Sequence, residues 1–67
     1  MSASRWVHID VDEIRRETEK AFLIVIEDEE YWLPKSQIAD ADNYNQGDTD
    51  CTMSITEFIA GEKDLMP

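Results

Sequence analysis

The stretch Ala21-Phe22-Leu23-Ile24-Val25-Ile26, followed by Glu27-Asp28-Glu29-Glu30 and by Tyr31-Trp32-Leu33-Pro34, decides the fold of this chain. Residues 21–26 are apolar on both faces, as in a strand that is covered on both sides. The four acids at 27–30 repel one another and are poor strand formers, which predicts a hairpin turn. Residues 31–33 favour a returning strand, and Pro34 ends it because proline lacks a backbone donor.

The residues before this hairpin predict another strand. Residues 6–14 alternate between apolar and polar side chains, the period of a strand with one wet face. The apolar face carries Val7, Ile9 and Val11, and the wet face carries His8, Asp10 and Asp12. The charged segment 15–20 predicts a turn or a frayed strand end.

The residues after the hairpin predict loops, a short strand and a helix. Residues 35–38 favour a tight turn or one helical turn, and residues 39–50 have loop composition. A short fourth strand is predicted for Thr49 to Met53. Ser54 and Glu57 have the spacing of a capping box, which predicts a helix from Ile55 to about Leu65.

Together these elements predict a single domain spanning residues 1–67, with a small α+β fold. We expect an antiparallel sheet of three to four strands, strongly twisted or partly closed, with one C-terminal helix packed on it. The apolar fraction of 42% is sufficient for a small core.

The charge of the chain restricts the class of its partners. Sixteen acidic residues against six basic ones give a net charge of −10, and the sequence pI is about 4.2. Such a chain would be repelled by a phosphate backbone and by an anionic membrane surface. We therefore expect neither direct nucleic-acid binding nor membrane binding.

Cysteine usage suggests a compartment. Cys51 is the only cysteine, so no intrachain disulfide can form, and small secreted domains usually carry several. The N-terminus lacks the apolar stretch of a signal peptide, and the run 21–26 is too short to span a membrane. We expect a cytoplasmic protein, located in the host cell if it comes from a phage.

No motif in the chain names a reaction. A loop starting at Asp42 places Gly47 at position 6 of an EF-hand, but Met53 stands where the motif needs glutamate. Weak, adventitious calcium binding is the remaining alternative. His8 has no obvious serine or cysteine partner in the sequence, and Asp50 beside Cys51 disfavours a thiolate. We therefore predict no enzyme, no catalytic residue, no metal site and no cofactor.

Two segments resemble a loose group of very small phage and mobile-element proteins. These are Thr18-Glu19-Lys20-Ala21-Phe22-Leu23-Ile24-Val25-Ile26 and Tyr31-Trp32-Leu33-Pro34-Lys35-Ser36-Gln37-Ile38, the second carrying a W-[LI]-P-K-S-Q motif. Members of the group also tend to end in a short helix, as predicted at 55–65. The resemblance implies a phage-like origin, and small acidic phage proteins such as anti-CRISPR proteins often inhibit host defence or nucleic-acid enzymes. The acidic loop at 40–50 and the net charge depart from the group.

The acidic residues are the candidate binding site. Asp10 and Asp12 on alternate positions of one strand face would lie roughly 6.6–6.8 Å apart, close to every second phosphate of a DNA strand in axial rise. We predict a protein partner with a basic surface, such as a CRISPR effector, contacted through Asp10, Asp12, Glu27, Asp28, Glu29, Glu30, Asp40, Asp42, Tyr44, Asp48 and Asp50. Tyr44 is included because an aromatic in a polar loop is expected to be exposed.

Three alternatives stay open. The acidic surface would also serve solubility alone. The chain would also suit an accessory or structural module of a phage replication or assembly complex, bound through apolar and aromatic surface. A homodimer is a further alternative, because so small a sheet leaves an edge strand to cover.

Overall fold

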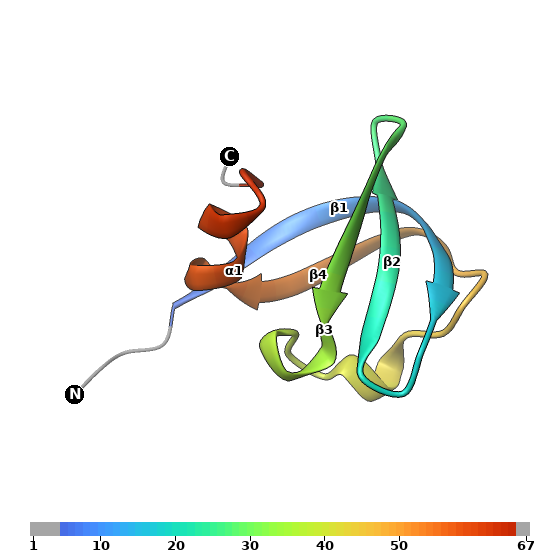
Figure 1. Cartoon of the computed structure of the whole chain (residues 1–67), viewed down its shortest axis with the longest axis horizontal. Helices are drawn as coiled ribbons and strands as arrows, with labels where there is room; N and C mark the ends of the chain where they lie inside the picture. The colour runs from blue at the N-terminus through green and yellow to red at the C-terminus, as the bar shows by residue number, and fades with distance from the viewer. Residues whose placement is uncertain (1–4, 66–67) are drawn as a thin grey trace.

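The long strand β1 (Trp6–Glu17) organises the sheet, because its two halves pair with different neighbours. The computed structural model describes residues 5–65. The first half of β1 pairs with β4 (Thr49–Thr56), and the second half pairs with β2 (Ala21–Ile26). The hairpin partner β3 (Glu29–Pro34) completes an antiparallel sheet in the order β3-β2-β1-β4. As Figure 1 shows, the β2–β3 hairpin therefore runs across the β1–β4 pair.

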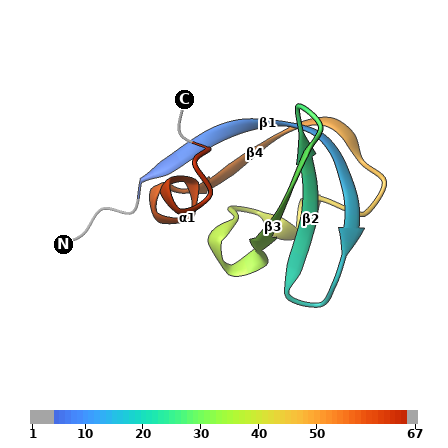
Figure 2. The same cartoon turned by 45° about the horizontal axis from the view of Figure 1, so that its top comes forward.

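A single α-helix, α1 (Glu57–Glu62), follows β4 and gives the described chain the small α+β fold that the sequence predicts. Two short 3₁₀ helices, η1 (Lys35–Gln37) and η2 (Ala41–Asn43), lie in the connection from β3 to β4. Figure 2 shows β1 arching from α1 at one end to the β2–β3 hairpin at the other. Within residues 5–65, no helix is both long and apolar enough to cross a membrane.

The core fills the concave side of this bent sheet. The alternation in β1 and β4 directs every second side chain inward, as the period-2 pattern predicts. The buried cluster contains Ile9, Val11, Ile14, Phe22, Ile24, Leu33, Ile38, Met53, Ile55, Ile59 and Ala60. These residues come from all four strands, from the connection after η1 and from α1.

The hairpin turn is shorter than predicted. Only Glu27 and Asp28 form it, with φ angles of 51° and 70°, and Glu29 and Glu30 already belong to β3. Two left-handed residues in succession are the geometry of a two-residue hairpin turn, whose twist matches that of the flanking strands. The acidic run does mark the turn, but mutual repulsion does not keep its last two members out of the strand.

Strand β1 is longer than predicted, because it continues through Glu17 where a turn or frayed end was expected from residue 15. Its register shifts between Ile14 and Arg16, as in a β-bulge. Arg15 then contacts Glu30 at 2.6 Å, and Glu17 contacts Lys35 at 2.8 Å. These two ion pairs, one to β3 and one to η1, accompany the main-chain pairing of Arg16 and Glu17 with β2.

Strand β4 is also longer than predicted, and the helix is correspondingly shorter. Ile55 pairs with Val7 and forms a bridge with Ile38, so it packs in the core as a strand residue. The capping residue is Thr56, whose Oγ1 accepts from the main-chain N–H of Ile59 at 3.2 Å. The predicted C-terminal helix is therefore present, but its predicted cap at Ser54 and its predicted bounds, Ile55 to about Leu65, are wrong.

Candidate protein-binding surface

Four of the predicted acidic residues meet where β1 leaves β2. Asp10 and Asp12 are exposed on the same face of β1, as alternation requires. The Oδ2 atom of Asp12 accepts a 2.8 Å hydrogen bond from the main-chain N–H of Glu27, which joins β1 to the hairpin turn. Asp50, on β4, lines one hollow together with Asp10 and Asp12. We call Asp10, Asp12, Glu27 and Asp50 the acidic ridge.

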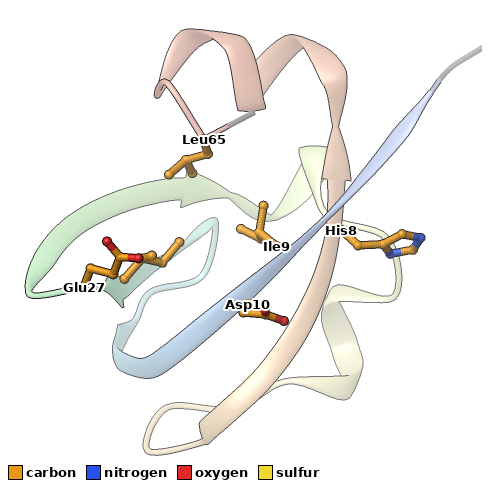
Figure 3. Close-up of a pocket in the computed structure, with 6 residues that line it drawn as sticks. His8, Ile9, Asp10, Glu27 and Leu65 are labelled. Atoms are coloured by element: carbon orange, nitrogen blue, oxygen red, sulfur yellow. The ribbon is translucent and has the colours of Figure 1, made fainter. Parts of the chain in front are cut away.

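Asp10 separates two hollows. The larger, of about 250 Å³, is lined by three apolar residues and three polar ones: Ile9, Ile26 and Leu65, and His8, Asp10 and Glu27. Figure 3 shows Leu65 above this hollow, with Ile9 and Glu27 on opposite sides of it. The smaller hollow, of about 180 Å³, is lined by Asp10, Val11, Asp12, Asp50, Cys51 and Thr52. The ridge thus borders concave surface as well as open solvent.

The acidic ridge has no internal counter-charge within the described residues. The ion pairs of the described chain all involve other acids. They join Arg5 to Glu57, Arg15 to Glu13 and Glu30, and Lys35 to Glu17. Asp10 instead accepts from the Thr52 hydroxyl at 3.3 Å. The negative charge of the ridge is therefore exposed to an external cation.

The other predicted acids fall into three groups: two have internal partners, two continue the hairpin from Glu27, and two lie around η2. Glu30 pairs with Arg15, and Asp48 accepts from the main-chain N–H of Asn45 at 2.9 Å. Asp28 sits beside Glu27 in the turn, and Glu29 begins β3. Asp40 and Asp42 are exposed around η2. The predicted set therefore does not form one continuous surface.

Tyr44 does not have the exposure predicted for it. Its ring is half-buried against the core, and its hydroxyl donates a 2.8 Å hydrogen bond to the main-chain oxygen of Thr52. Burial raises the pKa of Tyr44, and Cys51 and Asp40 raise it further. Tyr44 thus holds the β3–β4 connection against β4, a role that the polar loop around it conceals in the sequence.

His8 has a partner that the sequence did not indicate. Its Nδ1 lies 2.8 Å from Oγ of Ser54, because His8 and Ser54 are directly opposite in the β1–β4 register. Asp10 and Thr52 form the next pair along on the same face. The four side chains make a polar ladder beside the larger hollow. The alternation in β1 is visible in the sequence, but the register that joins residues 46 positions apart is not.

Cys51 lacks the environment of a reactive thiol, and the acids around it are not arranged as a metal site. Burial raises the pKa of Cys51 first, and Asp48 and Asp50 raise it further, so the thiolate is disfavoured as predicted. No group of three or more histidine, cysteine or acidic side chains within residues 5–65 is arranged to hold a metal ion.

Three large apolar side chains are exposed. Trp6 and Trp32 are 46% and 45% exposed, and Phe58 is 68% exposed. Trp6 lies opposite Thr56 where β4 passes into α1, so Trp6 and Phe58 are at the same end of the molecule. Trp32 is on the edge strand β3, at the other side of the sheet.

Comparisons with known proteins yield no precedent for this surface: no family model, no curated protein and no solved structure matches the chain. The chemical character of the acidic ridge is therefore the basis for a functional proposal.

Proposed function

We propose that this chain is a non-enzymatic binding protein that occupies the basic surface of a nucleic-acid-handling protein of its host, such as a CRISPR effector. The observation that carries the proposal is the acidic ridge, where four exposed acidic residues from β1, the hairpin turn and β4 border two adjoining hollows without an ion-pair partner in the described chain. A phage-like origin, implied by the W-L-P-K-S-Q motif, belongs to the same proposal.

The geometry of the ridge suits a surface that binds a phosphate backbone. Asp10 and Asp12 project from alternate positions of one strand, roughly 6.6–6.8 Å apart, and phosphates on one DNA strand advance roughly 3.4 Å each. The net charge of −10 would also steer the chain toward a basic groove and raise its association rate.

The larger hollow would add shape complementarity to a basic side chain of the partner. Lysine and arginine side chains carry a cationic head on an apolar stem. Ile9, Ile26 and Leu65 line the hollow and would contact such a stem, and Glu27, at its side, would meet the head. Asp10 also lines the hollow, with its carboxylate directed toward Thr52 on β4. A basic side chain of the partner would therefore be recognised by both of its parts.

The test is a pull-down from host lysate at low and high salt, with matched variants. The ridge variant Asp10→Asn, Asp12→Asn, Glu27→Gln, Asp50→Asn removes four charges, and its asparagines tolerate the left-handed backbone at Asp50. The control variant Glu19→Gln, Asp42→Asn, Glu62→Gln, Asp64→Asn removes four charges from exposed positions elsewhere. We expect the wild type and the control to retain a basic partner that high salt releases, and the ridge variant to lose it. Equal retention by both variants would refute the proposal.

A second candidate is an accessory module of a phage replication or assembly complex. The exposure of Trp6 and Phe58 at one end of the molecule favours it, because aromatic side chains dominate binding hot spots. Binding through this end, to another protein or to a second copy, would resist salt. It would be lost in Trp6→Ser and Phe58→Ser and kept in the ridge variant.

A further inference from the structure

The two edge strands of the sheet differ in whether their outward main-chain groups are covered. The β4 edge is covered by the β3–β4 connection: Ala39 N–H donates to the Ser54 oxygen at 2.8 Å, and Ile38 bridges to Ile55. The Tyr44 hydroxyl occupies the Thr52 oxygen on the same edge. The β3 edge has no such cover, since no hydrogen bond within residues 5–65 reaches the main chain of Glu30 or Trp32 from beyond β2. One edge is thus closed and the other is open.

The register shows which backbone groups the open edge presents. In a hairpin with a two-residue turn, the residues flanking the turn form a hydrogen-bonded pair, and such pairs then alternate along the ladder. Ile26 and Glu29 flank the turn, so Tyr31 and Leu33 bond to β2 while Glu30 and Trp32 point their N–H and C=O groups outward. Pro34 falls at the next outward position, where its missing N–H is not needed by β2.

Apolar surface lies beside these outward groups. Leu23 and Val25 face away from the core, on the opposite side of β2 from Phe22 and Ile24, yet they are only 8% and 7% exposed. Trp32 lies directly opposite Leu23 and is 45% exposed. Leu23, Val25 and Trp32 thus form a second apolar strip, on the face of the sheet opposite the core. A strand added at the β3 edge would extend this strip and cover the Trp32 ring.

We propose that the β3 edge accepts an extended segment of a partner protein in which basic and apolar residues alternate. The main-chain groups of Glu30 and Trp32 would pair with the segment, as in β-strand addition. Its apolar residues would pack on Trp32, and its basic residues would meet the carboxylates of Glu27, Asp28 and Glu29. The choice of a basic segment rests on the proposed function, whereas the open edge does not.

Charge argues against a second copy as the occupant. Each copy brings a net charge of −10 and four consecutive acids next to this edge. Charged residues on an edge strand are a usual protection against pairing of identical chains. The same acids that repel a second copy attract a lysine-bearing strand.

The test is hydrogen exchange of the Glu30 and Trp32 amides, followed by NMR with a ten-residue peptide of alternating lysine and valine. We expect exchange at these two amides to slow by at least about tenfold when the peptide binds. A peptide N-methylated on the lysine amides and another N-methylated on the valine amides probe its two backbone edges. We expect one of the two N-methylated peptides to lose the ability to slow exchange. We expect a peptide of alternating glutamate and valine not to slow it at all. Trp32→Thr should weaken binding, and Trp6→Thr should not.

The possible results separate this proposal from the proposed function. Unchanged exchange at Glu30 and Trp32, or equal effects of both N-methylated peptides, would overturn strand addition, even if the ridge variant still loses its partner in lysate. Peptide protection that persists in the variant Asp10→Asn, Asp12→Asn, Asp50→Asn, which keeps Glu27, would support the edge, even if the pull-down fails. Protection of both amides without peptide, together with a dimer in sedimentation, would overturn the proposal in favour of a second copy.

Discussion

The hydroxyl of Tyr44 donates a 2.8 Å hydrogen bond to the main-chain oxygen of Thr52 and so fastens the β3–β4 connection to the edge of the sheet. We predict that Tyr44→Phe lowers the free energy of unfolding by about 1 kcal/mol, the net value of one such hydrogen bond. Urea unfolding measures it. The control is Tyr31→Phe, because no hydrogen bond of the Tyr31 hydroxyl is present in the described chain. Equal losses in both variants would contradict this role.

The helix cap supplies a second prediction. Thr56 Oγ1 accepts from Ile59 N–H at 3.2 Å and donates to Oε1 of Gln37 at 2.6 Å. Thr56→Ala should therefore cost about 1–2 kcal/mol of stability. Ser54→Ala, which changes the residue that the sequence predicts as the cap, should cost clearly less, because the only hydrogen bond of the Ser54 hydroxyl within the described residues is to the exposed His8 ring. Chemical denaturation of both variants gives the order, and a larger loss in Ser54→Ala would contradict it.

The hairpin turn stores backbone strain that a glycine would release. Asp28 has a φ of 70°, and a left-handed conformation costs an ordinary residue roughly 1–2 kcal/mol. We predict that Asp28→Gly stabilises the protein by about 1 kcal/mol, since glycine at the second turn position is favoured in such hairpins. Glu29→Gln removes a neighbouring charge without relieving strain, so thermal unfolding of that variant separates the two effects. Equal gains would mean that charge, and not strain, is responsible.

The sequence predicts strands where the side-chain period is uninterrupted. Alternation from Val7 to Val11 and the apolar run 21–26 fall within β1 and β2, and Pro34 closes β3, all as expected. The sheet follows from these segments, and the α+β class follows once the C-terminal helix is added, which the sequence predicts within 55–65 and the structure has at Glu57–Glu62. Prediction fails at element ends, because those ends are fixed by contacts between residues distant in the sequence.

Two ends show why. The charged segment after Ile14 stays in β1, where Arg15 finds an ion-pair partner in Glu30 on β3 and Glu17 finds one in Lys35 of η1. Ile55 stays in β4 because Val7 and Ile38 lie beside it, which overrides a capping-box spacing at Ser54. The acidic ridge is likewise only half visible in the sequence: Asp10 and Asp12 share a predicted face, but the positions of Glu27 and Asp50 depend on the turn and on the β1–β4 register.

The pairing of Glu17 with Lys35 makes one contribution to stability depend on pH. The hydrogen bond from Lys35 lowers the pKa of Glu17 below its ordinary value of 4.5, and one from Gln46 lowers it further. A carboxyl with a lowered pKa stabilises the fold above its ordinary pKa, and this contribution is lost as the pH falls through the lowered value. We predict that Glu17→Gln is less stable than the wild type at neutral pH and that the difference closes below about pH 4.5.

Thermal unfolding at a series of pH values measures this difference. Glu19→Gln provides the control, because it removes the same charge from a residue without an ion pair in the described chain. A gap between Glu17→Gln and the wild type that stays constant in acid would show that the Lys35 contact does not titrate with Glu17.

Salt should stabilise the protein, and the acidic ridge should account for a disproportionate share of the effect. Like charges held close together destabilise the folded state, and screening by salt relieves that repulsion. We predict that the midpoint of thermal unfolding rises with sodium chloride in the wild type. The ridge variant should begin higher at low salt and rise less, while the control variant, with its four dispersed neutralisations, should stay closer to the wild type. If the two variants behave alike, only net charge matters and the ridge carries no special repulsion. If they differ as expected, the chain maintains four unneutralised carboxylates at a cost to its own stability, which is a property of binding surfaces rather than of a surface that serves solubility alone.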